Sequence, residues 1–178
     1  MNVTEFNALS RDDALSALVA CAAVPAWAAQ VADARPYADA RSLLEHADRL
    51  AAAWTDDEVD AALADHPRLG ENHAGTGASA EASAREQAAL RASADPGERL
   101  AAGNRLYEQR FDRVFLVRAA GRTAPEILAL LDERLDNDPA TELRVVAGEL
   151  REICALRLAG LLDHAPVGAP LDPTGGPA

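Results

Sequence analysis

Apolar residues recur every three or four positions along most of the chain, which is the spacing of one face of an α-helix. Ser10 is a typical helix-start residue, Pro25 fits a first helical turn, and Thr55 with Glu58 three residues later forms a capping-box signature. The N-terminal part is therefore predicted to form helices over about residues 10–23, 25–35, 39–54 and 55–63. In the first of these helices the expected buried stripe is Leu15, Leu18, Val19 and Ala22.

The C-terminal part continues this pattern after a loop. Residues 70–80 are mostly Gly, Asn, Ala, Thr and Ser, and such a long loop in a compact domain is often functional. The apolar run 114–117 fits a buried extended segment and equally the end of the preceding helix, because periodicity does not separate the two. Further helices are predicted over about residues 80–92, from Pro96 to about 111, 125–135 and 138–162.

These patterns predict an all-α protein. The expected architecture is a single compact domain of about eight or nine helices over residues 1–163. Ala and Leu dominate the apolar residues and only 4% of residues are aromatic, which favours helices over sheets. From His164 onward Pro and Gly dominate, so the tail over residues 164–178 is predicted to be disordered.

Charge excludes several classes of function. The formal net charge is −12, which argues against binding to nucleic acid or to an anionic membrane surface. All 17 basic residues are arginine. Without lysine, no imine can form on a side chain, so pyridoxal phosphate enzymes and lysine-dependent aldolases are excluded, and so is a P-loop.

The sequence also bears on location and redox state. The N-terminus lacks the basic region of a secretory signal, no stretch reaches the apolar length of a membrane span, and the C-terminus carries no peroxisomal signal. Cys21 and Cys154 are far apart and form no CxxC motif, so neither a disulfide framework nor a thiolate metal site is indicated. We expect a soluble, cytoplasmic protein.

His66 is the first candidate for chemistry. It precedes Pro67, and a residue before proline is pushed out of the helical region, so the helix that Thr55 opens should end here. An imidazole titrates near neutral pH, and a stiff turn would fix its position. His66 is thus a candidate proton-transfer group, with an ordinary surface histidine as the alternative interpretation.

Arg157 is the second candidate. It falls on the apolar stripe of the last predicted helix, where the flanking positions at intervals of three or four are apolar, such as Ile153 and Leu161. A guanidinium cannot lose its proton, so burying it without a partner costs several kcal/mol. Arg157 should therefore either pair with a carboxylate of the protein or face a polar pocket, where its planar donors could bind an anionic or urea-like ligand.

A third group of candidates lies on the helix predicted over residues 80–92. Ser83, Glu86 and Gln87 are separated by three and four positions and share one face. They could bind a ligand rich in N–H and C=O groups, although an exposed polar face is the usual explanation. A metal site made of His66, Glu71 and His73 is the weaker alternative, because the spacing matches no helical metal motif. We expect no metal.

Several short motifs occur together in a characteristic order. They are residues 24–27 (VPAW), 35–37 (RPY), 66–70 (HPRLG), 83–87 (SAREQ), 114–119 (VFLVRA), 134–138 (RLDND) and 153–158 (ICALRL). Over roughly residues 9–162 this ordered set resembles the decarboxylases of 2-oxo-4-hydroxy-4-carboxy-5-ureidoimidazoline (OHCU), a family of uric acid degradation.

The resemblance implies a cofactor-independent, typically dimeric all-α enzyme that converts OHCU to (S)-allantoin, with a possible functional coupling to a hydroxyisourate hydrolase. His66 matches the catalytic histidine of the family. The positions that match its substrate-binding residues are Pro67, Ser83, Glu86, Gln87 and Arg157, with backbone groups around Leu116, Val117 and Arg118. The alternative from another class is a non-catalytic helical module that binds a small ureide or purine-like ligand, and an activity assay would separate the two.

Overall fold

The computed structural model describes residues 1–64 and 97–163 of the chain, and these residues form helices joined by short connections. No strand occurs among them, so the all-α prediction is confirmed. The helices are α1 (Val3–Ala8), α2 (Arg11–Cys21), α3 (Pro25–Asp33), α4 (Ala40–Ala51), α5 (Asp56–Ala64), α7 (Gly97–Phe111), α8 (Ala124–Arg134) and α9 (Pro139–Asp163).

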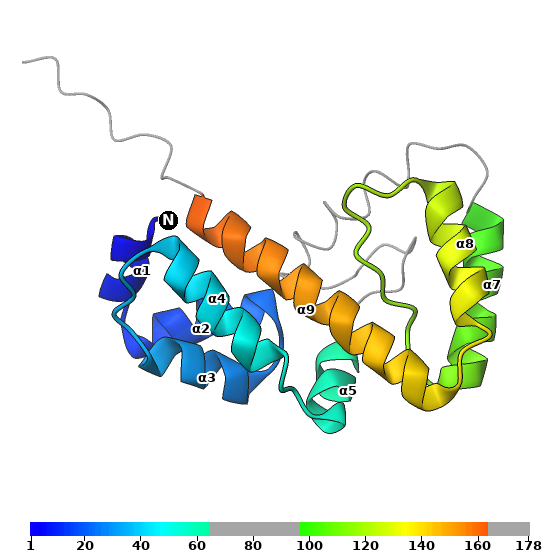
Figure 1. The fold of residues 1–178 in the computed structure, drawn as a ribbon, viewed down its shortest axis with the longest axis horizontal. Helices are drawn as coiled ribbons and strands as arrows, with labels where there is room; N and C mark the ends of the chain where they lie inside the picture. Colours follow the sequence, from blue (N-terminus) through cyan, green and yellow to red (C-terminus); the bar gives the residue numbers. More distant parts are fainter. Residues whose placement is uncertain (65–96, 164–178) are drawn as a thin grey trace, which may run out of the picture.

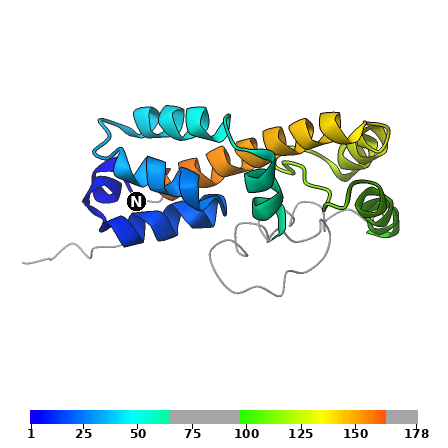
Figure 2. The same ribbon diagram turned by 90° about the horizontal axis from the view of Figure 1, so that it is seen from below.

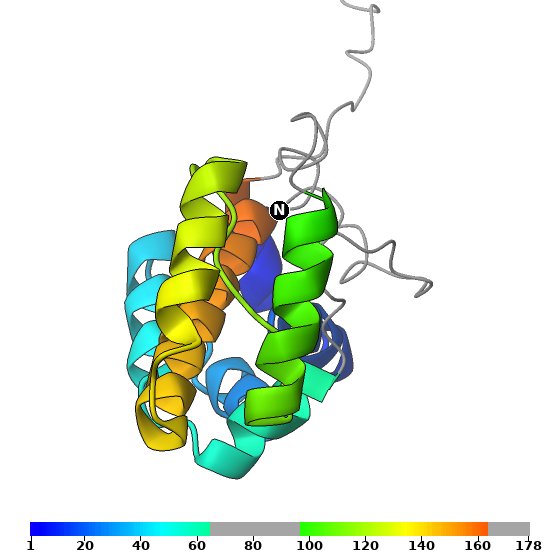
Figure 3. The ribbon, with the colours of Figure 1, turned by 90° about the vertical axis from the view of Figure 1, so that its right-hand side faces the viewer.

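The long helix α9 runs through the length of the described structure (Figures 1 and 2). Helices α1 to α4 gather around its C-terminal half, and α2, α4 and α5 all pack directly against it. Helices α7 and α8 lie side by side at its N-terminal end, as Figure 3 shows. Because α9 contacts both groups, it fixes the position of one group relative to the other.

The larger hydrophobic core fills the space between α2, α3, α4 and α9. Trp27 is fully buried there, and its indole N–H donates to the carbonyl of Ala47 at 2.9 Å, so the largest side chain of this core also has its polar group satisfied. Four residues of the α9 stripe that was predicted from spacing are buried, namely Val146, Leu150, Ile153 and Cys154. Leu143, Ala147 and Leu161 of the same stripe are partly buried against the core, and Leu158, which the prediction did not include, is buried as well.

A smaller second core joins α7 and α8 to the chain between them. Tyr107 is fully buried, with its ring 4.8 Å from Phe111 and 5.2 Å from Phe115, centroid to centroid. α7 ends where Asp112 adopts a positive φ of 52°, a left-handed conformation that aspartate tolerates better than most residues. Residues 114–119 are therefore not the tail of that helix, which resolves the alternative left open by the sequence.

The motif over residues 35–37 has a structural role at the N-terminal end. The Arg35 side chain donates to the carbonyls of Phe6, Leu9 and Ala32, so it satisfies acceptors at the ends of α1 and α3. The Tyr37 hydroxyl donates to the carbonyl of Val31 at 2.8 Å. These contacts explain why arginine and tyrosine stand here without assigning either a part in chemistry.

In the N-terminal region one prediction was wrong and one helix was missed. Val19 is 38% exposed rather than buried, because α2 turns Ala14, Leu18 and Cys21 inward. Small residues such as Ala14 let α2 approach its neighbours closely, a preference that counting large apolar residues does not detect. Helix α1 was not predicted at all, although Asn2 and Glu5 form a capping box at its start.

The expected boundaries of the remaining described helices agree with the structure, apart from the helix over residues 39–54, which ends at Ala51 and leaves Trp54 beyond it. The predicted loop over 70–80, the helix over 80–92 and the tail over 164–178 lie outside the described residues. Within residues 1–64 and 97–163, no helix has the length and apolar character needed to cross a membrane.

Candidate active site

The predicted site residues divide into two sets. His66, Pro67, Ser83, Glu86 and Gln87 lie outside the described residues, as do the weaker metal candidates Glu71 and His73. The structure describes Leu116, Val117, Arg118 and Arg157.

Arg157 lies half-buried on α9, beside the end of α2. Its Nη1 donates to the carbonyl oxygen of Cys21, the last residue of α2, at 3.4 Å. The carbonyl end of a helix carries partial negative charge, so a cation is favourable there. Burial raises the pKa of the Cys21 thiol to about 11, and the nearby Arg157 charge opposes this rise.

The segment over residues 114–118 connects the two cores. Leu116 belongs to the larger core, with Val114 packed against it, whereas Phe115 and Val117 belong to the core of α7 and α8. Alternation of side chains between two faces is the property of an extended backbone. The segment therefore lies between the cores in an extended conformation, and no β-strand pairs with it among the described residues.

Side chains from α8, from α9 and from the turn before α8 form hydrogen bonds with the backbone at one edge of this segment. Arg134 Nη1 donates to the Leu116 carbonyl at 2.7 Å, and the Arg118 N–H donates to Glu149 Oε2 at 2.6 Å. The carbonyl of Arg118 accepts from Arg122 Nη1 at 3.0 Å. The carbonyl of Leu116 and both polar backbone groups of Arg118 are thus already bound within the protein.

Val117 differs from its two neighbours. It is only 4% exposed, yet none of the described residues hydrogen-bonds to its N–H or its carbonyl. Buried backbone polar groups are nearly always paired in folded proteins. In an extended backbone the groups of Val117 point to the edge opposite those of Leu116 and Arg118. That edge is where a polar ligand could satisfy them.

Arg134 belongs to a buried polar cluster that sequence reasoning missed. Its Nε and Nη2 donate to Glu142 Oε1 at 2.8 and 2.6 Å, and its Nη2 also donates to the Tyr107 hydroxyl at 3.2 Å. The Tyr107 hydroxyl donates in turn to Glu142, and Asn137 Nδ2 donates to the other carboxylate oxygen at 2.7 Å. Arg134 and Glu142 are 4% and 1% exposed.

The signal for this cluster was present in the sequence. Arg134 continues the buried positions Ile127 and Leu131 at helical spacing, and Glu142 precedes Val146 and Leu150 by four and eight positions. These are charged residues on apolar stripes, the same anomaly that selected Arg157. Two opposite charges placed this way could have been recognised as a buried pair.

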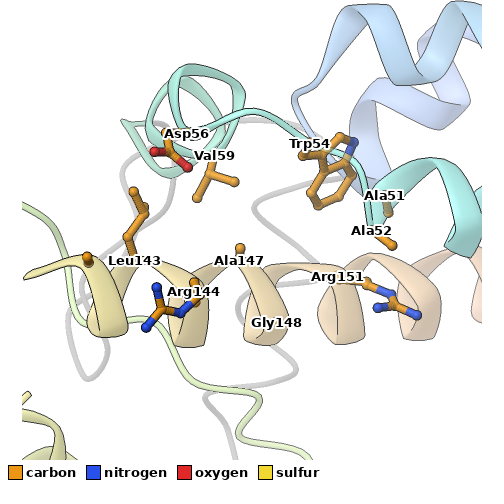
Figure 4. Close-up of a pocket in the computed structure, with 11 residues that line it drawn as sticks. Ala51, Ala52, Trp54, Asp56, Val59, Leu143, Arg144, Ala147, Gly148 and Arg151 are labelled. Carbon is orange, nitrogen blue, oxygen red and sulfur yellow. The ribbon is translucent and has the colours of Figure 1, made fainter.

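A groove of about 530 Å³ lies between α9, α5 and the end of α4, as Figure 4 shows. Trp54, Val59 and Arg151 are among its lining residues, and none of the predicted site residues lines it. Arg151 binds Asp48 of α4 through two hydrogen bonds of 2.5 and 2.7 Å. The groove is therefore distinct from the segment 114–118, and Arg151, one of the two arginines that line it, joins α4 to α9.

Comparison with known proteins places this chain in a family of all-α decarboxylases. The family model described as OHCU decarboxylase matches residues 7–159, which is most of the chain, so the chain belongs to the OHCU decarboxylase family. The resemblance inferred from the ordered motifs is thereby confirmed.

Curated relatives and solved structures similar to this chain include the following. A "Uric acid degradation bifunctional protein TTL" of Arabidopsis thaliana is 40% identical over 86 residues, which is 48% of this chain and 26% of that protein. A 2-oxo-4-hydroxy-4-carboxy-5-ureidoimidazoline decarboxylase of Amia calva is 39% identical over 59 residues, which is 33% of this chain and 34% of that protein. The matched segments thus span about a quarter to a third of these relatives.

The solved structures match over greater lengths. A crystal structure of OHCU decarboxylase in the presence of (S)-allantoin superimposes with a TM-score of 0.70 at 28% identity, over 82% of this chain and 96% of that one. A crystal structure of (S)-allantoin synthase gives a TM-score of 0.66 at 16% identity, over 92% of this chain and 55% of that one. The second comparison supports the fold alone.

Proposed function

We propose that this protein catalyses the decarboxylation of OHCU to (S)-allantoin, without a cofactor, in the degradation of uric acid. The observation that carries this proposal is the family match across residues 7–159. The structural similarity to an OHCU decarboxylase studied with (S)-allantoin supports the same reaction and the same product.

The substrate supplies its own electron sink. When the C–C bond to the carboxylate breaks, CO2 leaves and its bonding electrons pass into the ring, where the adjoining C=N bond accepts them. The nitrogen of that bond takes up a proton from solvent, the hydroxyl of the substrate loses its proton to become a carbonyl, and the adjoining ring carbon gains a proton in its place. The protein has to orient the substrate and move protons on one face of the ring, which a histidine and a set of hydrogen-bonding groups can do.

The proposed roles follow the chemistry of each residue. His66, beside Pro67, is the general acid/base that interacts with the substrate hydroxyl. Glu86 accepts from ureido N–H groups, and Arg157 donates to a carbonyl oxygen where negative charge develops. Ser83 and Gln87 complete the ring contacts. Among the described residues, the buried and unpaired backbone groups of Val117 support a ligand-binding edge at segment 114–118.

We further propose that the enzyme acts as a homodimer in the cytoplasm and takes its substrate from a hydroxyisourate hydrolase. The Arabidopsis relative is named a bifunctional protein of uric acid degradation, which supports a coupling between successive steps. The hydrolysis product of hydroxyisourate is therefore the substrate to supply in any assay.

Replacing His66 with asparagine tests the proposal directly. Asparagine keeps a polar side chain but cannot carry a proton between groups at neutral pH, so kcat should fall by about 10²- to 10⁴-fold, the usual contribution of general acid–base catalysis. The measurement is formation of (S)-allantoin from freshly generated OHCU, followed by circular dichroism. Near-normal turnover by the His66→Asn variant would remove His66 from the mechanism. A wild-type protein that gives no allantoin above the spontaneous rate would refute the function.

A further inference from the structure

We propose that two ionic clusters act as positioning devices that fix the backbone of Val117 for the substrate, an inference that rests on the function proposed above. The Arg134 cluster consists of Tyr107, Arg134 and Glu142. The Glu149 cluster consists of Arg122, Glu149 and the backbone of Arg118. Each cluster binds a residue that adjoins Val117 in the chain.

The Arg134 cluster is built to point one donor at the Leu116 carbonyl. Glu142 takes two guanidinium hydrogen bonds, from Nε and Nη2, which leaves Nη1 directed at Leu116 at 2.7 Å. The guanidinium carbon lies 4.7 Å from the ring centroid of Phe115, so the planar group is also held by stacking. A guanidinium fixed on three sides can place a carbonyl more tightly than a flexible side chain can.

Tyr107 limits the freedom of Glu142 in this cluster. Its hydroxyl donates to the carboxylate that Arg134 binds, and both side chains are buried. Burial, with a smaller contribution from this hydrogen bond, raises the pKa of the Tyr107 phenol, so the hydroxyl remains a proton donor throughout the neutral range. The carboxylate is therefore bound from several directions and cannot rotate away from Arg134.

The Glu149 cluster holds the other side of Val117. Glu149 is a residue of α9 whose side chain is 13% exposed, and its Oε2 accepts the Arg118 N–H at 2.6 Å. Arg122 Nη1 lies 3.2 Å from each carboxylate oxygen of Glu149 and also donates to the Arg118 carbonyl. One carboxylate and one guanidinium thus bind both polar backbone groups of Arg118.

The two clusters together fix one edge of the segment and leave the other edge for a ligand. In an extended chain, Leu116 and Arg118 direct their polar groups to one side and Val117 directs its own to the opposite side. Ionic clusters of this kind are costly to bury and contribute little net stability compared with apolar side chains. Their placement on both neighbours of Val117 is better explained by a need for accurate backbone position.

Two variants test the inference, each with a matched control. Arg134→Lys keeps a positive charge but cannot bind Glu142 and the Leu116 carbonyl with diverging donors. Glu149→Ala removes the acceptor of the Arg118 N–H. Its control is Glu152→Ala, one turn further along α9, which loses an equal charge from a residue that pairs with the Arg118 side chain at 2.7 Å. The control for Arg134→Lys is Asp48→Asn, which breaks the pair with Arg151 between α4 and α9.

Hydrogen–deuterium exchange and steady-state kinetics on the full chain are the measurements. Both test variants should speed amide exchange over residues 116–118 and lower kcat/KM by about 10- to 100-fold, because a misplacement near 1 Å can cost about 100-fold in rate. Both controls should leave exchange in this segment and kcat/KM within about twofold of wild type, since they lie outside the two clusters.

The other possible results contradict either the positioning role of the clusters or the proposed function, and the two failures can be told apart. Unchanged exchange over residues 116–118 in both test variants would overturn the positioning role. Faster exchange with unchanged kcat/KM would overturn it as well, because the clusters would then serve the fold alone. If the wild-type protein fails to turn over OHCU, the proposed function fails, and the exchange data still decide whether the clusters hold the segment.

Discussion

Arg134 and Glu142 show how this protein keeps single charged residues inside its structure. Both are almost completely buried, and each has partners for its charge: the carboxylate binds Arg134, Tyr107 and Asn137. Bringing two charges out of water costs several kcal/mol per ion, and attraction between them offsets this cost only while both are present. The free energy of unfolding should therefore fall strongly when one member of the pair is replaced, and much less when both are replaced by apolar residues.

Urea unfolding of a double-mutant cycle tests this expectation. Glu142→Leu alone leaves the Arg134 charge buried without its carboxylate and should lower the free energy of unfolding by about 3–5 kcal/mol. The double variant Arg134→Met with Glu142→Leu replaces both charges with apolar side chains of similar size and should recover most of that loss. A double variant less stable than Glu142→Leu would show that the pair itself stabilises the fold.

The packing of α7 on α8 depends on a glycine. A Cβ atom at Gly103 would lie 2.3 Å from a terminal methyl of Leu131, which is 1% exposed inside the core of α7 and α8. Leu131 has little space to move away, since a protein interior is packed as densely as an organic crystal. Gly148 on α9 is a useful contrast, because a Cβ there would meet nothing within 4 Å.

Alanine at these two glycines should therefore have opposite effects. Gly103→Ala forces an overlap with Leu131 and should destabilise the protein by about 1–3 kcal/mol, even though alanine favours helix by about 1 kcal/mol over glycine. Gly148→Ala gains the same helix preference without an overlap and should stabilise by about 0.5–1 kcal/mol. Melting temperatures of the two variants check the signs, and a stable Gly103→Ala protein would mean that Leu131 can repack.

The helices could be predicted because their signals are local. Ser10 caps α2 as expected, Pro25 starts α3, and Thr55 with Glu58 forms the predicted capping box before α5. α1 was missed because its six residues carry too little apolar periodicity. The exposure of Val19 was also missed, since which face of α2 turns inward depends on how closely α3 and α9 approach, and that is a tertiary property.

The candidate site could be predicted only in part, because contacts between helices are also a tertiary property. Arg157 was selected because one helix shows it out of place, and the structure puts it half-buried near Cys21. The two clusters around Val117 join α8, or the turn before α8, with the first half of α9. A single helix can therefore reveal a charged residue on an apolar stripe, but not the partner that it binds. The family resemblance named segment 114–118, but only the fold shows which backbone groups are bound and which are not.

The whole molecule is strongly acidic and buries several weak acids, which together determine its response to alkali. The net charge is already −12 at pH 7. Burial raises the pKa of Cys21 to about 11, and burial also raises the pKa of Cys154 above its ordinary value of 9.0. Partial burial raises the pKa of Tyr37 to about 12. All of these groups can ionise more readily in the unfolded chain than in the folded one.

Stability should therefore fall as pH rises above about 9, with the two thiols as leading contributors. A thiol whose pKa is higher in the folded state contributes stability that is complete below its unfolded pKa, near 9.0, and is lost as pH approaches 11 for Cys21. Each thiol can contribute up to about 1.4 kcal/mol of loss per pH unit in this window. Melting temperatures between pH 7 and 10.5 should drop less steeply for the double variant Cys21→Ala with Cys154→Ala than for wild type. The packing lost in the double variant lowers its melting temperature equally at all pH values, so the slope of melting temperature against pH is the informative quantity. Parallel slopes for the two proteins would mean that tyrosines and net charge, and not the thiols, cause the loss of stability at high pH.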